Sequence, residues 1–168
     1  MDDMKTPKII VIAHNIRSTH NVGSVFRTCD GFGIKKLYLT GYTPYPILQN
    51  DTRLPHISEK LTTQISKTAL GAEKTVPFSY EENIQNIIKK LQNDGYSILG
   101  LEQDSRSVML PEYVPQQKIA LILGEEVNGI TDTIMQQCDT LLEIPMQGKK
   151  ESFNVSVAAG IALYALST

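Results

Sequence analysis

Short apolar runs alternate along the chain with segments whose apolar residues recur at helical spacing. The short runs predict six strands, at Lys8–Ala13, Leu37–Thr40, Thr75–Phe78, Ile98–Leu101, Lys118–Leu123 and Leu141–Pro145. The segments between them predict helices at Val22–Phe32, Ile57–Leu70, Tyr80–Asn93 and Val155–Leu166, with a short one after Thr131. This alternation predicts an α/β fold, in which helices cover both faces of a largely parallel sheet as an α/β/α sandwich.

Turn and capping residues mark the ends of several of these elements. Ser79 and Glu82 form the capping-box pattern at the start of the third helix, and Asp94-Gly95 ends it. The 41–55 segment contains three prolines and little periodicity, which predicts a long loop of the kind that is usually functional or mobile. The last helix is apolar nearly all round, so we expect it to be buried.

Length and composition fit one folded domain. The chain has 168 residues, 41% of them apolar, and it shows no repeat and no interdomain linker. No apolar run approaches the roughly 20 residues that a membrane span needs. The N-terminus lacks the small-residue cleavage site of a secretory signal. We therefore expect a soluble cytoplasmic protein with no membrane partner.

Metal and redox chemistry receive no support from the residues that usually carry them. The two cysteines, Cys29 and Cys138, have no C-x-x-C spacing, and such cysteines are usually reduced core residues in the cytosol. The three histidines show no metal-binding spacing such as H-E-x-x-H. We expect no metal site.

The charges are unevenly distributed. Residues 1–74 carry ten Lys/Arg against six Asp/Glu, whereas the remainder carries six against twelve, for a formal net charge of −2. A basic half on an acidic protein can present a phosphate-binding face. A solvated mixed surface is an equally good interpretation of the charges alone.

The first polar motif is Asn21-Val-Gly-Ser-Val-Phe-Arg27. Asn21 is a candidate helix cap, and Gly23 allows a backbone or ligand to approach closely. Arg27 follows one to two turns later on the same helix, and its fork of donors suits a phosphate. The alternative is a capped helix that carries an ordinary surface arginine.

The second and third motifs each follow a predicted strand, where ligands bind in parallel α/β sheets. Gly124-Glu-Glu-Val-Asn-Gly129 brackets paired carboxylates with glycines, which favours a cationic or hydroxyl-rich ligand over phosphate. Ile144-Pro-Met-Gln-Gly-Lys-Lys-Glu-Ser-Phe-Asn-Val155 places polar groups at the start of the last helix, where backbone N–H groups are free. An ordinary turn and simple capping by Ser152 or Asn154 are the alternatives. There is no G-x-G-x-x-G after the first strand and no P-loop pattern.

Taken together, the three motifs resemble those of the SpoU family in the SPOUT class of RNA methyltransferases. The family pattern is N-x-G-x-x-x-R, then G-x-E-x-x-G, then I-P-M-x-G-x-x-x-S-L-N-V, and this chain has all three in that order. One departure is Phe153, where the family usually has leucine; it keeps the position apolar. Another is length, since many relatives carry an additional RNA-binding domain. We expect residues 1–168 to form a single catalytic domain without one.

The resemblance implies S-adenosylmethionine as the cofactor, RNA as the partner and methylation of a ribose 2′-hydroxyl as the reaction. It also implies a C-terminal deep trefoil knot and a homodimer with the active site near the subunit interface. The implied catalytic residues are Arg27, which activates the hydroxyl, with Asn21, Glu126, Ser152 and Asn154. The implied cofactor-binding residues are Leu101, Gly124, Ile144, Met146 and Phe153. Transfer RNA is favoured over ribosomal RNA. The alternatives are a non-catalytic RNA-binding protein of the same fold, an enzyme that methylates a base, and a small-molecule nucleotide-binding enzyme.

Overall fold

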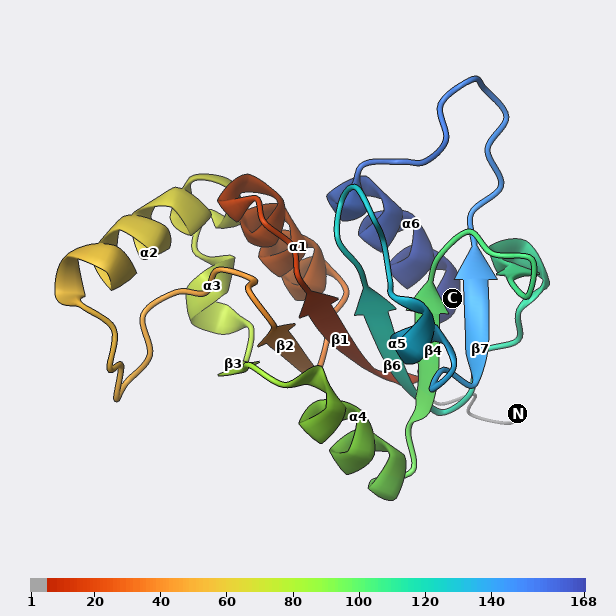
Figure 1. Ribbon diagram of the computed structural model, residues 1–168, viewed down its shortest axis with the longest axis horizontal. Coiled ribbons are helices and arrows are strands. Elements are labelled where there is room, and N and C mark those ends of the chain that lie inside the picture. Colours follow the sequence, from red (N-terminus) through yellow and green to blue (C-terminus); the bar gives the residue numbers. More distant parts are fainter. Residues whose placement is uncertain (1–5) are drawn as a thin grey trace.

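The alternating sequence pattern folds as a parallel sheet with helices on both faces (Figure 1). The computed structural model describes residues 6–168. Its strands are β1 (Lys8–His14), β2 (Lys36–Thr40), β3 (Phe78–Glu81), β4 (Ser97–Leu101), β5 (Val108–Met109), β6 (Lys118–Leu123) and β7 (Thr140–Glu143). Its helices are α1 (Thr19–Gly31), α2 (Pro55–Ala69), α3 (Ala72–Thr75), α4 (Ile84–Asn93), a 3₁₀ turn at Leu110–Glu112, α5 (Asp132–Met135) and α6 (Val155–Ser167).

The strand order β3-β2-β1-β6-β4-β7-β5 confirms the predicted parallel α/β sheet. The register aligns the carboxyl ends of the central strands, since Ala13 pairs with both Leu39 and Leu123 and Leu101 pairs with Leu142. The loops that leave these strands therefore start from one edge of the sheet. The order also inserts β7 between β4 and β5, although both precede it in the chain. The trefoil knot stays a prediction.

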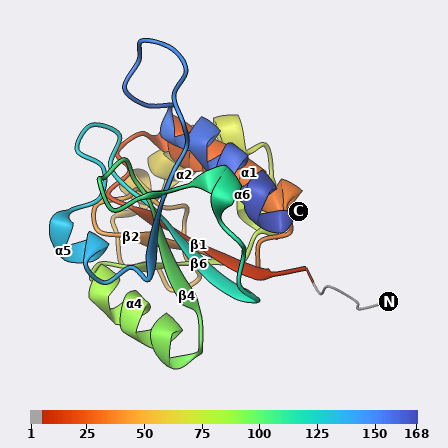
Figure 2. The same cartoon turned by 90° about the vertical axis from the view of Figure 1, so that its right-hand side faces the viewer.

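Alternate residues of the strands supply two separate cores. In β1, Ile9, Val11 and Ala13 face a core shared with α1, α2 and α6, whereas Ile10 and Ile12 face a core shared with α4. Figure 2 shows α1, α2 and α6 on one side of the sheet and α4 on the other. Because side chains alternate along a strand, a strand buried on both faces has a continuous apolar run, which explains the uninterrupted KIIVIA and KIALIL segments.

The third strand lies later in the chain than predicted. Thr75 ends α3, and the strand occupies Phe78–Glu81, where Ser79 pairs with Tyr38 of β2. The capping-box prediction was therefore wrong, and α4 begins at Ile84 with Asn83 as its cap. The Asn83 side chain accepts a hydrogen bond from the Gln85 N–H at 3.0 Å. Pairing along β2 outweighed the weaker local preference of Ser79 for a helix start.

The first helix begins three residues earlier than predicted, at Thr19. Ser18 is its N-cap, since the Ser18 Oγ accepts a hydrogen bond from the Asn21 N–H at 3.1 Å. The predicted capping role of Asn21 was wrong, and its side chain, which lies buried in the first turn, is available for other partners.

The last helix is buried on one face only, so its predicted full burial was wrong. Ala159, Ala162, Leu163 and Leu166 lie in the core. Val157, Ile161 and Tyr164 are 50%, 36% and 64% exposed, and their spacing places them on one stripe of α6. An apolar stripe of this kind on a surface usually marks an interaction site.

The described helices are all too short or too polar to cross a membrane. Residues 1–5 lie outside the described residues. They include two of the acidic residues and one of the lysines counted in the basic half, and they belong to the segment used for the secretion-signal prediction.

Candidate active site

A cavity of about 490 Å³ lies beyond the carboxyl ends of β4, β6 and β7. Its walls are the loops that follow these strands and the first turns of α6. Eight of the ten residues that the sequence analysis selected line it: Leu101, Gly124, Glu126, Ile144, Met146, Ser152, Phe153 and Asn154. Segments more than 40 residues apart in the chain thus meet in one cavity at the sheet edge, where ligands of parallel α/β proteins bind.

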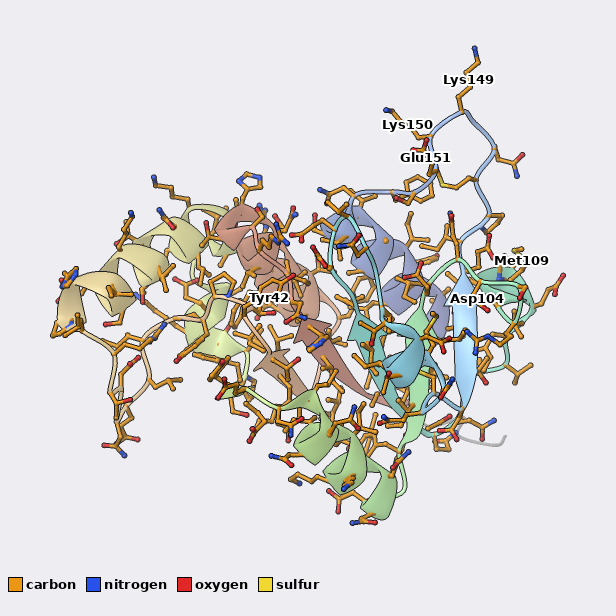
Figure 3. All side chains as sticks on the ribbon, in the orientation of Figure 1. Tyr42, Asp104, Met109, Lys149, Lys150 and Glu151 are labelled. Atoms are coloured by element: carbon orange, nitrogen blue, oxygen red, sulfur yellow. The ribbon has the colours of Figure 1, made fainter. Side chains whose placement is uncertain are left out.

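The charged side chains that line this cavity are all acidic. They are Glu102, Glu125, Glu126, Glu143 and Glu151, and no lysine or arginine is among the lining residues. Lys149 and Lys150 belong to the same loop as Glu151 but lie at its outer end, exposed and away from the sheet (Figure 3). A cavity lined in this way attracts a cation and repels a phosphate.

The loop after β6 closes on itself around Gly124. The Glu125 N–H donates to the Gly129 carbonyl at 3.2 Å, and the Gly129 N–H donates to the Glu125 carbonyl at 2.9 Å. A Cβ atom on Gly124 would lie 2.6 Å from the Gly129 carbonyl carbon and 2.7 Å from the Ile130 nitrogen. Both neighbours are backbone atoms, so only glycine allows this close approach.

Glu102 fixes this loop from the end of β4, and the sequence analysis missed it. Its carboxylate accepts hydrogen bonds from the backbone N–H of Ile130 at 2.8 Å and of Gln103 at 2.9 Å. The signal was present, because Glu102 is the first residue after a predicted strand. The residue was overlooked because it belongs to none of the three motifs.

A chain of side-chain hydrogen bonds joins the three motifs. The Asn21 Nδ2 donates to Glu126 Oε1 at 3.2 Å, and the Asn154 Nδ2 donates to Asn21 Oδ1 at 3.2 Å. Asn154 also caps α6, since its Oδ1 accepts a hydrogen bond from the Ser156 N–H at 2.9 Å. Asn154 therefore caps the last helix, as the capping alternative predicted, and also joins the third motif to the first.

Glu126 is the centre of this network. Its carboxylate also accepts hydrogen bonds from the backbone N–H groups of Arg17 at 3.2 Å and Ser18 at 3.3 Å. Burial acts to raise the pKa of Glu126, but hydrogen bonds from the backbone and from Asn21 outweigh it and hold the pKa below its ordinary value. The group is thus an anion at neutral pH, fixed in orientation by three donors.

Arg27 lies apart from the other predicted catalytic residues. It is exposed on α1, it lines neither this cavity nor the second one described below, and its side chain makes no hydrogen bond or ion pair within residues 6–168. Six residues of helix separate it from Asn21, a rise of about 9 Å. A different arginine, Arg17, reaches the cavity wall, with its guanidinium 3.1 Å from Glu125 Oε1.

Residues 8–164 match the SpoU rRNA Methylase family. The chain belongs to this family. The match contains all three motifs and all seven strands.

Relatives and solved structures of the SpoU family support the same assignment. The chain is 31% identical over 160 residues to the 23S rRNA (guanosine-2'-O-)-methyltransferase of Coxiella burnetii, covering 95% of this chain and 58% of that enzyme. It thus spans less than two thirds of that relative's length. A crystal structure of the SpoU-type tRNA modifying enzyme of Aquifex aeolicus has a TM-score of 0.78 at 26% identity, over 97% of this chain and 75% of that one. An AdoMet-bound rRNA methyltransferase from Sinorhizobium meliloti shares the fold, with a TM-score of 0.78 at 21% identity over 96% of this chain and 56% of that one.

Proposed function

We propose that this SpoU-family chain transfers a methyl group from S-adenosylmethionine to a ribose 2′-hydroxyl of structured RNA in the cytoplasm. The proposal rests on one cavity, which residues of the second and third motifs line together. Asn21 of the first motif is joined to this cavity by hydrogen bonds to Glu126 and Asn154. The Coxiella burnetii relative is named as a 23S rRNA (guanosine-2'-O-)-methyltransferase. The Sinorhizobium meliloti enzyme was crystallised with AdoMet bound.

The side chains that line the cavity fit S-adenosylmethionine. This cofactor carries its methyl group on a positively charged sulfur, which is what makes the methyl transferable. Five lining carboxylates complement that charge. Glu125 Oε1 is buried and close to Arg17 but accepts no well-aligned hydrogen bond, so it retains acceptor capacity. Gly124, Ile144 and Phe153 would contact the cofactor largely through backbone groups, with Leu101 and Met146 as apolar walls.

The residues of the first motif would serve the RNA. Arginine rarely gives up its proton, because its pKa exceeds about 12. We therefore assign to Arg27 the binding of the phosphate next to the reacting ribose, which lowers the pKa of the 2′-hydroxyl. A phosphate oxygen or water takes the proton. Asn21, held between Glu126 and Asn154, orients the ribose, and Ser152 borders the same space. The main contribution of the site is alignment of the reacting groups.

A homodimer would account for the position of Arg27. The exposed apolar stripe of α6 offers a surface for a second copy, and C2 pairing is the commonest way to cover such a surface. Arg27 belongs to the helix that packs on α6, since the adjacent Thr28 lies against Gly160 in the middle of α6. We propose that the dimer forms through α1 and α6. Each chain then supplies its Arg27 to the cavity of the partner.

Transfer RNA is the substrate to test first. A relative from Aquifex aeolicus that is named as a tRNA (guanosine(18)-2'-O)-methyltransferase is 32% identical to this chain over 159 residues.

Titration calorimetry tests the cofactor assignment. We expect S-adenosylmethionine to bind one site per chain, and we expect ATP, which has the same adenosine but adds anionic phosphates, to give no heat. The carboxylates of the cavity are the reason for the difference. Absence of any binding by S-adenosylmethionine would favour a non-catalytic RNA-binding protein. Equal binding of ATP would favour a nucleotide-binding enzyme of another kind.

A further inference from the structure

A second cavity, of about 550 Å³, lies at the carboxyl ends of β1 and β2. Its walls come from the β1–α1 and β2–α2 loops and from α2, and they include Arg17, Tyr42, Tyr45, Arg53 and Gln64. Two arginines and no carboxylate line it, whereas the charged residues that line the first cavity are all carboxylates. Each arginine is paired with a carboxylate outside the lining, Arg17 with Glu125 and Arg53 with Asp51. None of the three family motifs contributes a side chain to its walls.

The two cavities adjoin at Arg17 and Ser18. Both residues line the second cavity, and their backbone N–H groups donate to the Glu126 carboxylate, which lines the first. The Arg17 guanidinium makes an ion pair with Glu125, another wall residue of the first cavity. If one monomer of a bound polymer lies beside Glu126, the neighbouring monomer can therefore lie in the second cavity.

Tyr42 is presented to solvent from a rigidly held backbone. Its side chain is 50% exposed, yet its N–H donates to Asn15 Oδ1 at 3.0 Å. The turn that presents Tyr42 uses two residues that tolerate the left-handed region, Asn15 with a φ of 55° and the preceding Gly41 with a φ of 64°. Figure 3 shows Tyr42 near the end of β2, on the side of the sheet edge that faces α1.

Arg17 completes the exposed part of this cavity. Its guanidinium lies 5.6 Å from the centre of the Tyr42 ring, and its side chain is 69% exposed. Its partner Glu125 is only 12% exposed, so the ion pair joins one exposed and one mostly buried side chain. The exposed part of the guanidinium keeps donors that can bind a phosphate.

The remaining aromatic wall is structural. Tyr45 is stacked between Tyr80, at 4.0 Å, and the guanidinium of Arg53, at 3.6 Å. Arg53 is in turn bound to Asp51 and to the Tyr45 carbonyl. Both faces of the Tyr45 ring are thus covered, which leaves Tyr42 as the lining aromatic with a face available to a ligand.

We propose that this second cavity binds the nucleotide next to the methylated one, with its base stacked on Tyr42 and its phosphate held by Arg17. The inference rests on the proposed function for the identity of the polymer as RNA. Every base has a π face, and stacking on an exposed aromatic beside a cation is how proteins hold unpaired nucleotides. The acidic cavity takes the cationic cofactor, and the adjoining cavity, with the exposed Arg17 and Tyr42, takes the next nucleotide of the RNA.

Fluorescence anisotropy with a labelled single-stranded RNA decamer of mixed sequence tests this site. Tyr42→Ala should weaken RNA binding about tenfold or more, and Tyr42→Phe should stay within about twofold, because the ring rather than the hydroxyl is the stacking surface. Arg17→Gln should weaken binding and lower the slope of log affinity against log salt concentration by about 0.7. Lys90→Ala is the matched control, since Lys90 also makes an exposed ion pair, with Asp94, but on α4 across the sheet.

The outcomes separate this site from the proposed function. Calorimetry with S-adenosylmethionine and a thermal unfolding curve are recorded for every variant, and Tyr42→Ala should leave both unchanged. The proposed nucleotide site is wrong if Tyr42→Ala binds RNA with wild-type affinity, or if Lys90→Ala weakens RNA binding as much as Tyr42→Ala does. Neither result contradicts methyl transfer by the wild-type chain. Loss of binding in Tyr42→Phe overturns stacking. A Tyr42-dependent RNA affinity in a chain that does not bind S-adenosylmethionine supports the site and contradicts the proposed function.

Discussion

Arg27→Ala should lower kcat for RNA methylation by about 10²–10³-fold, because a charged donor aimed at the phosphate next to the reacting ribose acts mainly in the transition state. The affinity for S-adenosylmethionine should stay within twofold of the wild-type value, since the walls of the acidic cavity come from other residues and Arg27 is assigned to the RNA phosphate. Single-turnover methylation and calorimetry measure the two quantities. Lys89→Ala, which removes an exposed cation on α4, is the control and should leave both unchanged. Wild-type turnover in Arg27→Ala would show that the residue is not catalytic.

A mixing experiment then shows which chain supplies Arg27. Arg27→Ala and Glu126→Ala, each inactive alone, are unfolded together and refolded at equal concentration so that mixed dimers form. If each Arg27 serves the partner's cavity, every mixed dimer has one intact site, and activity should recover to about a quarter of the wild-type level. If Arg27 serves its own cavity, every site lacks one of the two residues and the mixture stays inactive. A protein that sediments as a monomer at assay concentration also contradicts the shared site.

Gly124→Ala should weaken cofactor binding. The added Cβ would lie within 2.7 Å of the backbone of both Gly129 and Ile130, and two backbone atoms cannot move aside as a flexible side chain would. The loop that carries Glu125 and Glu126 must then shift, and the cavity wall shifts with it. We expect the dissociation constant for S-adenosylmethionine to rise at least about tenfold, a change of roughly 1.4 kcal/mol.

Gly148→Ala is the matched control for this substitution. Gly148 belongs to the third family motif just as Gly124 belongs to the second, but a Cβ there would meet nothing within 4 Å, and its φ is not positive. Its affinity for S-adenosylmethionine should stay within twofold of wild type. Equal losses in the two variants would mean that motif membership, and not close packing, decides the effect. A thermal unfolding curve without cofactor separates loss of the cavity from loss of the fold.

The parts of the fold that follow from periodicity could be predicted from the sequence. The buried strands β1 and β6 are continuous apolar runs, and a run buried on both faces has few other interpretations. Ser79 shows the limit of local signals. It has the capping-box spacing to Glu82, but it pairs with β2, and no local pattern contains that long-range pairing.

The site could be predicted as a set of residues but not as an arrangement. The motif order identified the residues of the acidic cavity, whereas the rotation of α1 decides that Asn21 faces Glu126 and that Arg27 faces solvent. That rotation depends on the packing of α1 against α2 and α6, which the sequence of α1 does not specify. Glu102 was missed because it contributes through its place at the end of β4, outside any motif, and the position of Tyr42 at the end of β2 is likewise invisible to a motif search.

The sequence predicted an apolar α6 correctly, but the full burial expected from that character was wrong. A helix that is apolar all round is buried either in its own chain or against another, and periodicity does not distinguish the two. Tyr164, which is 64% exposed, shows that α6 is not fully covered within this chain.

Locating the transferred methyl group on RNA tests directly whether the chain methylates a ribose 2′-hydroxyl. The purified chain is incubated with S-adenosylmethionine carrying a labelled methyl group and with unmethylated tRNA and rRNA fractions, and the RNA is digested to nucleosides for mass spectrometry. We expect label on the ribose of one nucleoside, at a position where the 2′-O-methyl group also blocks alkaline cleavage, and label at least about a hundredfold weaker with Arg27→Ala. Label on a base, or no transfer to any RNA fraction by a chain that binds the cofactor, would contradict it.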